Sequence, residues 1–359
     1  MRRTMWLAAG LACLLAFGGC GSSGVGNEGS AAGSGSAASV SGETGETETS
    51  GPKHAREVSI SIPFTSEGQE YQLDGILTLP ESVKKPAVAI LIQGSGQSDY
   101  NETVGENHPF QDLAWGLADH GIATIRYNKR YYQYPELAPE ALTISDEVLE
   151  DAATAIAMAG EMDSVDPGAI FLIGHSLGGM LAPEIARTNP QLRGFISLAG
   201  SPRHLADILY DQNVDALEQR EDVNQVQAQA SLAMLGQMVE QAKEASSLKD
   251  TNMLLGVPLS YWASLNAIDA SGAARNLRIP MLFLQGTADF QVKVETDFAA
   301  WQTALDGHPN ARFQTYEGLN HLFMPTNGKT DASEYETPGQ VDAQVIGDIA
   351  SFIQENASL

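Results

Sequence analysis

The chain has 359 residues, 43% of them hydrophobic, and 45 acidic against 20 basic residues give it a net charge of −25. A chain of this length and composition can bury a large core, while its negative charge repels phosphate backbones, which excludes nucleic acid as the expected partner and disfavours polyanionic substrates. The two cysteines, Cys13 and Cys20, both lie near the N-terminus, so a disulfide framework is excluded for the rest of the chain.

Residues 1–19 have the pattern of a secretory signal peptide. Two arginines precede an apolar stretch at 5–17 that is too short for a lasting membrane span. Two glycines directly before Cys20 resemble the lipobox of bacterial lipoproteins, although Phe17 stands where leucine is usual. We therefore expect an extracytoplasmic protein, lipid-anchored to the bacterial cell membrane through Cys20. The alternative is a secreted protein whose signal is cleaved nearby and in which Cys20 is incidental.

Residues 20–55 are predicted to be a flexible tether. They are rich in Gly, Ser, Ala, Thr and Glu and contain almost nothing to bury. A coil of about 30 residues reaches about 30 Å, enough to hold a domain clear of a membrane. The change in composition near residue 56 predicts the start of a folded domain over 56–359.

The next segments predict a strand-and-helix alternation. Segments 58–62 and 71–79 alternate apolar with polar residues, which predicts antiparallel strands joined by a turn at Glu67 and Gly68. Continuous apolar runs predict parallel strands covered on both faces, at 87–92, 122–125, 169–173, 194–198 and 281–284. Helical patterns occupy 110–120, 147–162, 177–187, 294–305 and 340–355. Together they predict an α/β fold with a mostly parallel, doubly wound sheet.

A segment at about 203–274 interrupts this alternation. Its Gln-, Glu- and Ala-rich part, 214–249, favours helix. We therefore predict an inserted helical cap over the carboxyl edge of the sheet, where ligands of such folds bind. Met and Leu clusters at 232–238 and 253–259 are candidates to line an acyl pocket, and packing between cap helices explains them equally well.

Residues 174–178, Gly-His-Ser-Leu-Gly, follow the apolar run 169–173 and open a predicted helix. A sharp strand-to-helix turn of this kind exposes a serine as a nucleophile, and glycines on either side avoid collisions in the crowded turn. The five-residue pattern alone is weak, and an ordinary Gly-rich turn is the alternative. Its place between strand and helix favours Ser176 as the nucleophile.

A serine hydroxyl needs a base to take its proton, and the base needs a third group to orient it. Asp289 lies in the loop after the strand at 281–284, at the same sheet edge as Ser176, and is predicted as the orienting acid. Asp269 and Asp306 fall where capping or solvated roles are better explanations.

The predicted base is His321, which follows a strand at 311–316 and so lies at the carboxyl edge of the sheet. His308 precedes that strand and is better explained as a turn residue. Two backbone N–H groups should bind the developing oxyanion. We expect them to be those of Leu177, after the nucleophile, and Ser95, in the Gly-rich loop 93–96. That loop lacks the Lys and the Gly spacing of a phosphate cradle.

These residues together resemble the α/β-hydrolase superfamily over nearly all of 58–357. More narrowly, the chain looks like a bacterial group of dienelactone-hydrolase-like and S9-peptidase-like esterases, in segments 93–99, 101–104, 109–118 and 126–130. The resemblance implies carboxylic ester hydrolysis through an acyl-enzyme, with Ser176, Asp289 and His321 as the triad and a small-molecule ester as substrate. It implies no metal or organic cofactor.

Two positions depart from that pattern. Gln93 stands where many relatives carry His, which leaves the second oxyanion donor open, and Asn128 stands in place of Asp, which would weaken an ion pair with Lys129 or Arg130. A salt-bridged scaffold beneath the site is expected from Asp99, Glu102 and Arg130.

Other functions remain open at this point. A peptidase or amidase of the same fold would share the triad, and a surface-tethered binding protein could keep the fold without turnover. A coenzyme A thioesterase is disfavoured because its substrate is intracellular and polyanionic. The sequence does not determine the oligomeric state.

Overall fold

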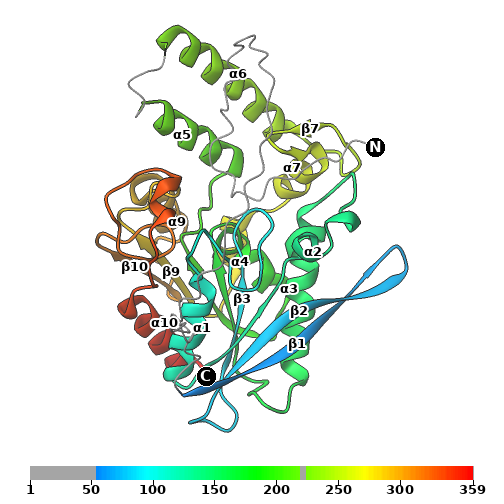
Figure 1. The fold of residues 1–359 in the computed structure, drawn as a ribbon, viewed down its shortest axis with the longest axis vertical. Helices are drawn as coiled ribbons and strands as arrows, with labels where there is room; N and C mark the ends of the chain where they lie inside the picture. The colour runs from blue at the N-terminus through cyan, green and yellow to red at the C-terminus, as the bar shows by residue number, and fades with distance from the viewer. Residues whose placement is uncertain (1–53, 219–223, 359) are drawn as a thin grey trace, which may run out of the picture.

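The computed structural model describes residues 54–218 and 224–358. The predicted signal peptide, Cys20 and nearly all of the predicted tether lie outside these residues. The centre of the molecule is one eight-stranded sheet with helices on both faces (Figure 1). Its strands in chain order are β1 (Ala55–Ser66), β2 (Gln69–Pro80), β3 (Val88–Ile92), β4 (Ala123–Tyr127), β5 (Ile170–His175), β6 (Leu192–Leu198), β9 (Met281–Gly286) and β10 (Ala311–Tyr316).

The first two strands form the predicted antiparallel hairpin, which extends from the body of the molecule (Figure 1). Its two-residue turn consists of Glu67 at φ 51° and Gly68 at φ 79°. Two positive φ angles give a turn whose twist matches that of the flanking strands, and glycine adopts such angles without a steric penalty. The spatial order of the whole sheet is β1-β2-β4-β3-β5-β6-β9-β10.

From β4 to β10 all neighbouring strands are parallel. Every residue of β3, β4, β5 and β9 is buried, as the continuous apolar runs predicted. Because side chains alternate between the faces, Ile90 joins one apolar layer and Leu91 the other. The α/β fold with a mostly parallel, doubly wound sheet is thereby confirmed.

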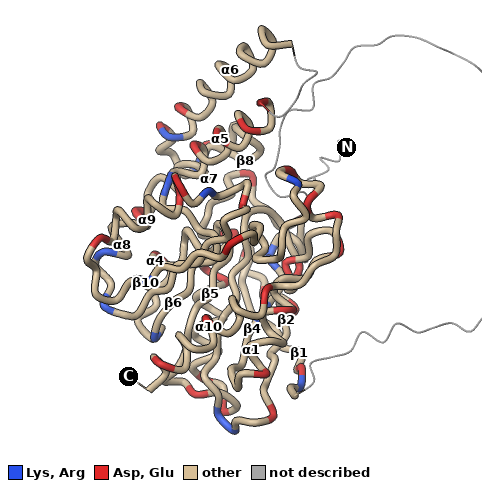
Figure 2. Tube along the Cα trace, turned by 90° about the vertical axis from the view of Figure 1, so that its left-hand side faces the viewer, with Lys and Arg blue, Asp and Glu red and all other residues tan. Residues whose placement is uncertain are grey.

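The helices divide between these two layers. One face is covered by α1 (Pro109–Asp119) and α10 (Ala343–Asn356), the other by α3 (Glu150–Glu161), α4 (Leu177–Thr188) and α9 (Ala299–Ala304). Acidic residues are distributed over the molecule rather than gathered in one patch (Figure 2). Among residues 54–218 and 224–358, no helix has both the length and the apolar character needed to cross a membrane.

Between β6 and β9 the chain forms mainly helices. They are α5 (Leu205–Glu218), α6 (Gln225–Glu244), α7 (Leu259–Asn266) and α8 (Ala270–Asn276), with a small hairpin of β7 (Met253–Leu254) and β8 (Val257–Pro258) before α7. Of these helices, α5, α6 and α7 lie at one end of the molecule (Figure 1), whereas α8 packs against α4 and α9 beside the sheet. The helical segment expected at 214–249 is therefore the end of one helix and the whole of another. Asn224 caps α6 by accepting the N–H groups of Val226 and Gln227.

Candidate active site

Ser176 occupies the turn between β5 and α4. Its backbone has φ 52° and ψ −113°, a conformation that is rare for residues other than glycine and therefore strained. Two hydrogen bonds hold it: its N–H donates to Leu198 O at 2.8 Å, and its carbonyl accepts the N–H of Met180 at 2.9 Å. The two bonds hold the backbone in this strained conformation, which places the side chain of Ser176 at the carboxyl end of the parallel strands.

The two glycines of the motif allow close packing at this turn. A Cβ on Gly174 would lie 2.7 Å from the backbone nitrogen of Gly179, and one on Gly178 would lie 2.9 Å from the carbonyl oxygen of Gln93. Both distances are shorter than carbon atoms tolerate, so any larger residue would push α4 away from the sheet.

Asp289 follows β9 and binds the imidazole of His321. Asp289 Oδ2 lies 2.7 Å from His321 Nδ1 and also accepts the side-chain amide of Gln285 at 2.8 Å. Its Oδ1 accepts the backbone N–H groups of Gln291 at 2.8 Å and Val292 at 3.0 Å. Each of these hydrogen-bond partners is a donor to the carboxylate. Asp289 therefore orients the ring of His321 with the proton on Nδ1, which leaves Nε2 to exchange a proton.

The loop that carries His321 is held by its neighbour Asn320. The Asn320 side-chain oxygen accepts the N–H groups of Leu322 at 3.0 Å and Met324 at 3.1 Å. Phe323 adopts φ 59°, which turns the chain sharply after the histidine. The loop is therefore compact, and Asn320 satisfies two of its backbone N–H groups.

Ser176 and His321 line the same cavity, which has a volume of about 450 Å³. Ser95 and Leu177 line it too, and Asp289 lies behind His321. The structure thus brings the five predicted site residues of the folded domain together, and the volume is that of a small-molecule site.

The Gly-rich loop after β3 is fixed by two buried charges. Lys129 Nζ donates to the carbonyl oxygens of Gly94 and Gly96, each at 2.7 Å. The N–H of Gly94 donates to Glu102 Oε1 at 2.5 Å and is therefore not free to bind an oxyanion. Because a trans peptide directs its C=O and N–H oppositely, the Ser95 N–H points away from Lys129.

Leu177 is the first residue of α4, where backbone N–H groups have no partner within the helix. Its N–H and that of Ser95 are therefore the two candidates for binding negative charge in the cavity. Gln93, at the start of the Gly-rich loop, donates instead to the carbonyl of Tyr127 and so holds that loop against β4.

Lys129 was not predicted as part of the site. It is only 3% exposed, and its third hydrogen bond goes to Glu147 at 2.8 Å, in the π-helical turn Ser145–Leu149. Tyr261 of α7 lies beside Glu147, and burial together with this carboxylate raises the pKa of Tyr261 well above its ordinary value. The signal in the sequence was a lysine two residues after a fully buried strand, but the partners of its side chain are all distant in the chain.

Asp99, Glu102 and Arg130, expected to form a salt-bridged scaffold, bind other partners and show no bond to one another. Arg130 instead pairs with Asp151 at 2.6 Å, Asp99 accepts two hydrogen bonds from Thr103, and Glu102 turns toward β5. The three residues therefore face different elements, and two of them, Arg130 and Glu102, form buried ion pairs with other partners.

Asn128 also differs from its expected role. Its side chain accepts the N–H of Tyr100 at 2.8 Å, whereas Lys129 and Arg130 find carboxylates in the helical segment that follows. An acid at position 128 is therefore not needed for either ion pair.

Asp269 and His308, the alternatives to Asp289 and His321, have the structural roles expected of them. Asp269 caps α8 by accepting the N–H of Gly272, and His308 accepts the N–H of Asn310 in the turn before β10. Within the described parts of the chain, no group of three or more His, Cys, Asp and Glu side chains is arranged to hold a metal ion.

The cap contributes to the cavity through α5 rather than through the Met and Leu clusters. Apolar residues lining the cavity include Leu205, Ile208 and Leu209. Neither 232–238 nor 253–259 supplies a lining residue of this cavity. Leu235 and Met238 of the first cluster pack against the core instead. Helix packing is thus the role that the structure gives to the first cluster.

Comparisons with known proteins agree with this geometry. Residues 104–325 match the family model of serine aminopeptidases, S33, and include Ser176, Asp289 and His321. The esterase EstD of Thermotoga maritima is 34% identical over 286 residues, which cover 78% of this chain and 65% of EstD, so the chain spans slightly less than two thirds of that relative.

Solved structures share the fold at low identity. Est1E from Butyrivibrio proteoclasticus is 16% identical with a TM-score of 0.52, and the match covers 84% of this chain and 99% of Est1E. A puromycin-hydrolyzing peptidase of Mycobacterium tuberculosis is 16% identical with a TM-score of 0.53 over 85% of this chain and 40% of the peptidase. The chain therefore has the α/β-hydrolase fold and belongs to the S33 serine aminopeptidase family.

Proposed function

We propose that this protein is a serine hydrolase that cleaves carboxylic esters of small molecules through an acyl-enzyme. One observation carries the proposal: Ser176, on a strained turn, lines the same cavity as His321, whose Nδ1 is bound by Asp289 at 2.7 Å. The similarity to the esterase EstD supports ester hydrolysis in particular.

In the proposed reaction, His321 Nε2 takes the proton of Ser176 as its Oγ attacks the ester carbonyl carbon. The N–H groups of Ser95 and Leu177 bind the resulting oxyanion. As the intermediate collapses, His321 gives the proton to the leaving alcohol oxygen. Water then attacks the acyl-enzyme with His321 again as base, and the carboxylic acid and free Ser176 are released.

The cavity lining supports an apolar acyl group. Met180 of α4 and the apolar side chains of α5 line the cavity together with Val292. No charged group of α5 lies among the lining residues of the cavity, and the net charge of −25 disfavours anionic substrates. We therefore assign the acyl chain to the part of the cavity under α5.

A peptidase is the second candidate, and the family match to serine aminopeptidases favours it. Such an enzyme must bind an N-terminal ammonium group. Glu336, an exposed carboxylate that lines the cavity, has the charge to do so. An aminoacyl anilide tests this candidate directly.

The deciding experiment compares the native protein with Ser176→Ala. Both are treated with a fluorophosphonate probe and assayed on p-nitrophenyl acetate, a longer p-nitrophenyl ester and an aminoacyl anilide. Labelling and ester hydrolysis by the native protein alone are expected. Labelling with turnover of the anilide only would favour the peptidase, and no labelling of the folded native protein would favour a binding protein.

We also propose that the protein is extracytoplasmic and attached to the bacterial cell membrane by lipid at Cys20, with the segment 20–55 as tether. The support is the sequence pattern of 1–20 alone, which lies outside the described residues. Metabolic labelling with a palmitate analogue should tag the native protein and not Cys20→Ser. Equal secretion of both without label would identify a secreted enzyme.

A further inference from the structure

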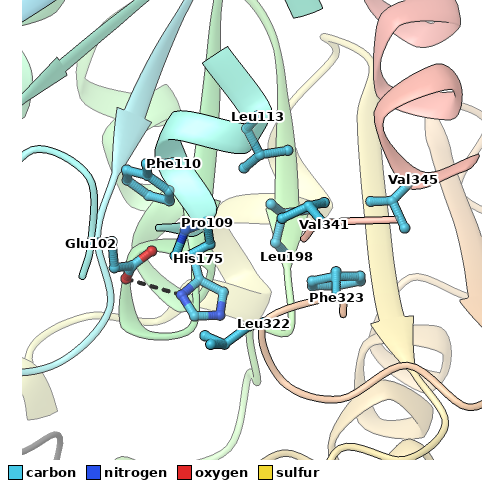
Figure 3. A pocket seen from close by; sticks show the side chains of 10 residues that line it. All are labelled: Glu102, Pro109, Phe110, Leu113, His175, Leu198, Leu322, Phe323, Val341 and Val345. Carbon is cyan, nitrogen blue, oxygen red and sulfur yellow. Dashed lines mark hydrogen bonds and ion pairs between the residues drawn. The ribbon is translucent and has the colours of Figure 1, made fainter. Parts of the chain in front are cut away.

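Beneath Ser176, the mechanism leaves one buried ion pair unused, between Glu102 and His175. Figure 3 shows the carboxylate of Glu102 directed at the ring of His175 among apolar side chains. Each residue is only 6% exposed. Glu102 lies in the loop after β3 at φ 52°, and His175 is the last residue of β5, directly before the nucleophile.

Both ring nitrogens of His175 face hydrogen-bond acceptors. Nδ1 lies 3.0 Å from Glu102 Oε1, and Nε2 lies 2.9 Å from the backbone carbonyl oxygen of His321. A carbonyl has no proton to donate, so Nε2 must carry one. Glu102 Oε1 also accepts the N–H of Gly94 at 2.5 Å, so this oxygen acts as an acceptor and the remaining proton lies on Nδ1.

We propose that His175 is held as an imidazolium and that its ion pair with Glu102 is a positioning unit of the active site. Its hydrogen bond with Gly94 positions the Gly-rich loop 93–96, called the oxyanion loop below. His175 is covalently joined to Ser176, and its bond to the carbonyl of His321 positions the loop that carries the base. His175 and Glu102 touch no reacting atom in this proposal. They act by fixing the relative positions of the three loops.

The surroundings support a charged His175. Burial lowers the pKa of His175, but Glu102, the carbonyl of His321 and the charge of Asp289 raise it, and the net effect is a raised pKa. The ring of His321 is the other titratable group beside it, with ring centroids 4.7 Å apart. The remaining side chains that line the small cavity at the pair are apolar: Pro109, Phe110, Leu113, Leu198, Leu322, Phe323, Val341 and Val345 (Figure 3).

The first test is the protonation state itself, measured by NMR on the full chain carrying ¹⁵N-labelled histidine. Exposed histidines lose their second ring proton with an ordinary pKa of about 6.5. We expect one histidine to remain doubly protonated at a higher pH, where the exposed histidines are already neutral, and to lose that signal in Glu102→Gln. A folded native protein in which no histidine stays doubly protonated after the exposed histidines have become neutral would overturn the proposal. This readout does not depend on turnover, so it fails or succeeds separately from the proposed function.

The second test rests on the proposed esterase activity and uses the pH profile of Glu102→Gln. Without the carboxylate charge, the pKa of His175 falls, so the ring loses a proton as the pH rises. Since Nε2 or Nδ1 then lacks a proton for its acceptor, the loops separate. At a pH where His175 of the native enzyme is still charged, kcat of the variant should be about ten-fold lower than that of the native enzyme, the effect of one lost hydrogen bond. The difference should shrink toward lower pH, where the ring is charged in both proteins, with little change in KM.

The matched control is His108→Gln. His108 Nδ1 lies 3.0 Å from the hydroxyl of Thr103, so this variant removes another imidazole bonded to the same loop, outside the ion pair. It should keep the native pH profile. An active, folded Glu102→Gln with the native profile would show that the pair is merely structural. If that variant does not fold, the NMR measurement on the native protein still decides the protonation state.

Discussion

The helix that follows Ser176 and the helix α6 differ sharply in how much of their surface is buried. Nine of the twelve residues of the first helix, α4, are buried, whereas α6 buries only Val239 and Ala242 of its twenty. Two apolar side chains of α6, Val226 and Met234, are 76% and 65% exposed. The nucleophile thus lies in a densely packed part of the molecule, where substitutions are expected to be destabilising. Substitutions on the exposed side of α6 are expected to be tolerated.

The largest effect should come from the nucleophile. Ser176→Ala should lower kcat/KM for esters on the order of 10⁵- to 10⁶-fold, because no other group forms the acyl-enzyme. Its melting temperature should stay near that of the native protein, since the backbone bonds of residue 176 remain. Steady-state kinetics and calorimetry on the same preparations test both points, and appreciable residual turnover would place the nucleophile elsewhere.

The next effect should come from Lys129→Met, which releases the carbonyls of Gly94 and Gly96. With the oxyanion loop free, kcat should fall by about 10²- to 10³-fold, the effect of losing one oxyanion donor. The variant should also lose about 3–5 kcal/mol of stability, because Glu147 is left buried without its partner.

The double variant Lys129→Met with Glu147→Gln separates these two effects. It removes the unpaired charge and should regain stability, as measured by urea unfolding, while kcat stays low. Recovery of kcat along with stability would mean that Lys129 only supports the fold.

Packing at the turn is tested by Gly178→Ala. The added Cβ would lie 2.9 Å from the carbonyl oxygen of Gln93, so we expect a loss of about 1–3 kcal/mol in the free energy of unfolding. The control is Gly347→Ala in α10, where a Cβ meets nothing within 4 Å and helix propensity should add up to about 1 kcal/mol. Equal effects at the two glycines would contradict the packing argument.

The smallest effects should distinguish the inner from the outer cap. Leu209→Ala, in α5, should lower kcat/KM for a longer acyl ester about ten-fold relative to the acetate, because apolar contact with the chain is lost. Met234→Ala, on the exposed side of α6, should change neither this ratio nor stability by more than about 0.5 kcal/mol. An equal shift in acyl preference for both variants would show that α6 also contacts substrate.

The sheet and the turn could be predicted because their signals are local. Continuous apolar runs, the two-residue turn at Glu67 and the glycines around Ser176 each reflect a constraint within a few neighbouring residues. Asp289 and His321 followed from one further rule, that the carboxyl ends of parallel strands meet at one edge.

The groups that escaped prediction act through contacts between distant segments. Lys129 meets carbonyls about 35 residues away along the chain, and Glu102 meets His175 across 73 residues. Charge alone could not tell which partner each would bind, so the sequence did not show that Arg130 pairs with Asp151 and Glu102 with His175. The Gln- and Ala-rich cap favoured helix throughout, and nothing in its composition indicated that α5 would line the cavity.

The hairpin of β1 and β2 has one more consequence. Ala55 pairs with Pro80, and β2 runs antiparallel to β4, so the chain enters the folded body at the end of the sheet opposite to the carboxyl ends where Ser176 stands. The segment before Ala55 is thus attached at the end of the sheet opposite to the cavity. In an enzyme held by its N-terminus, the length of the parallel strands would separate the point of attachment from the bound substrate.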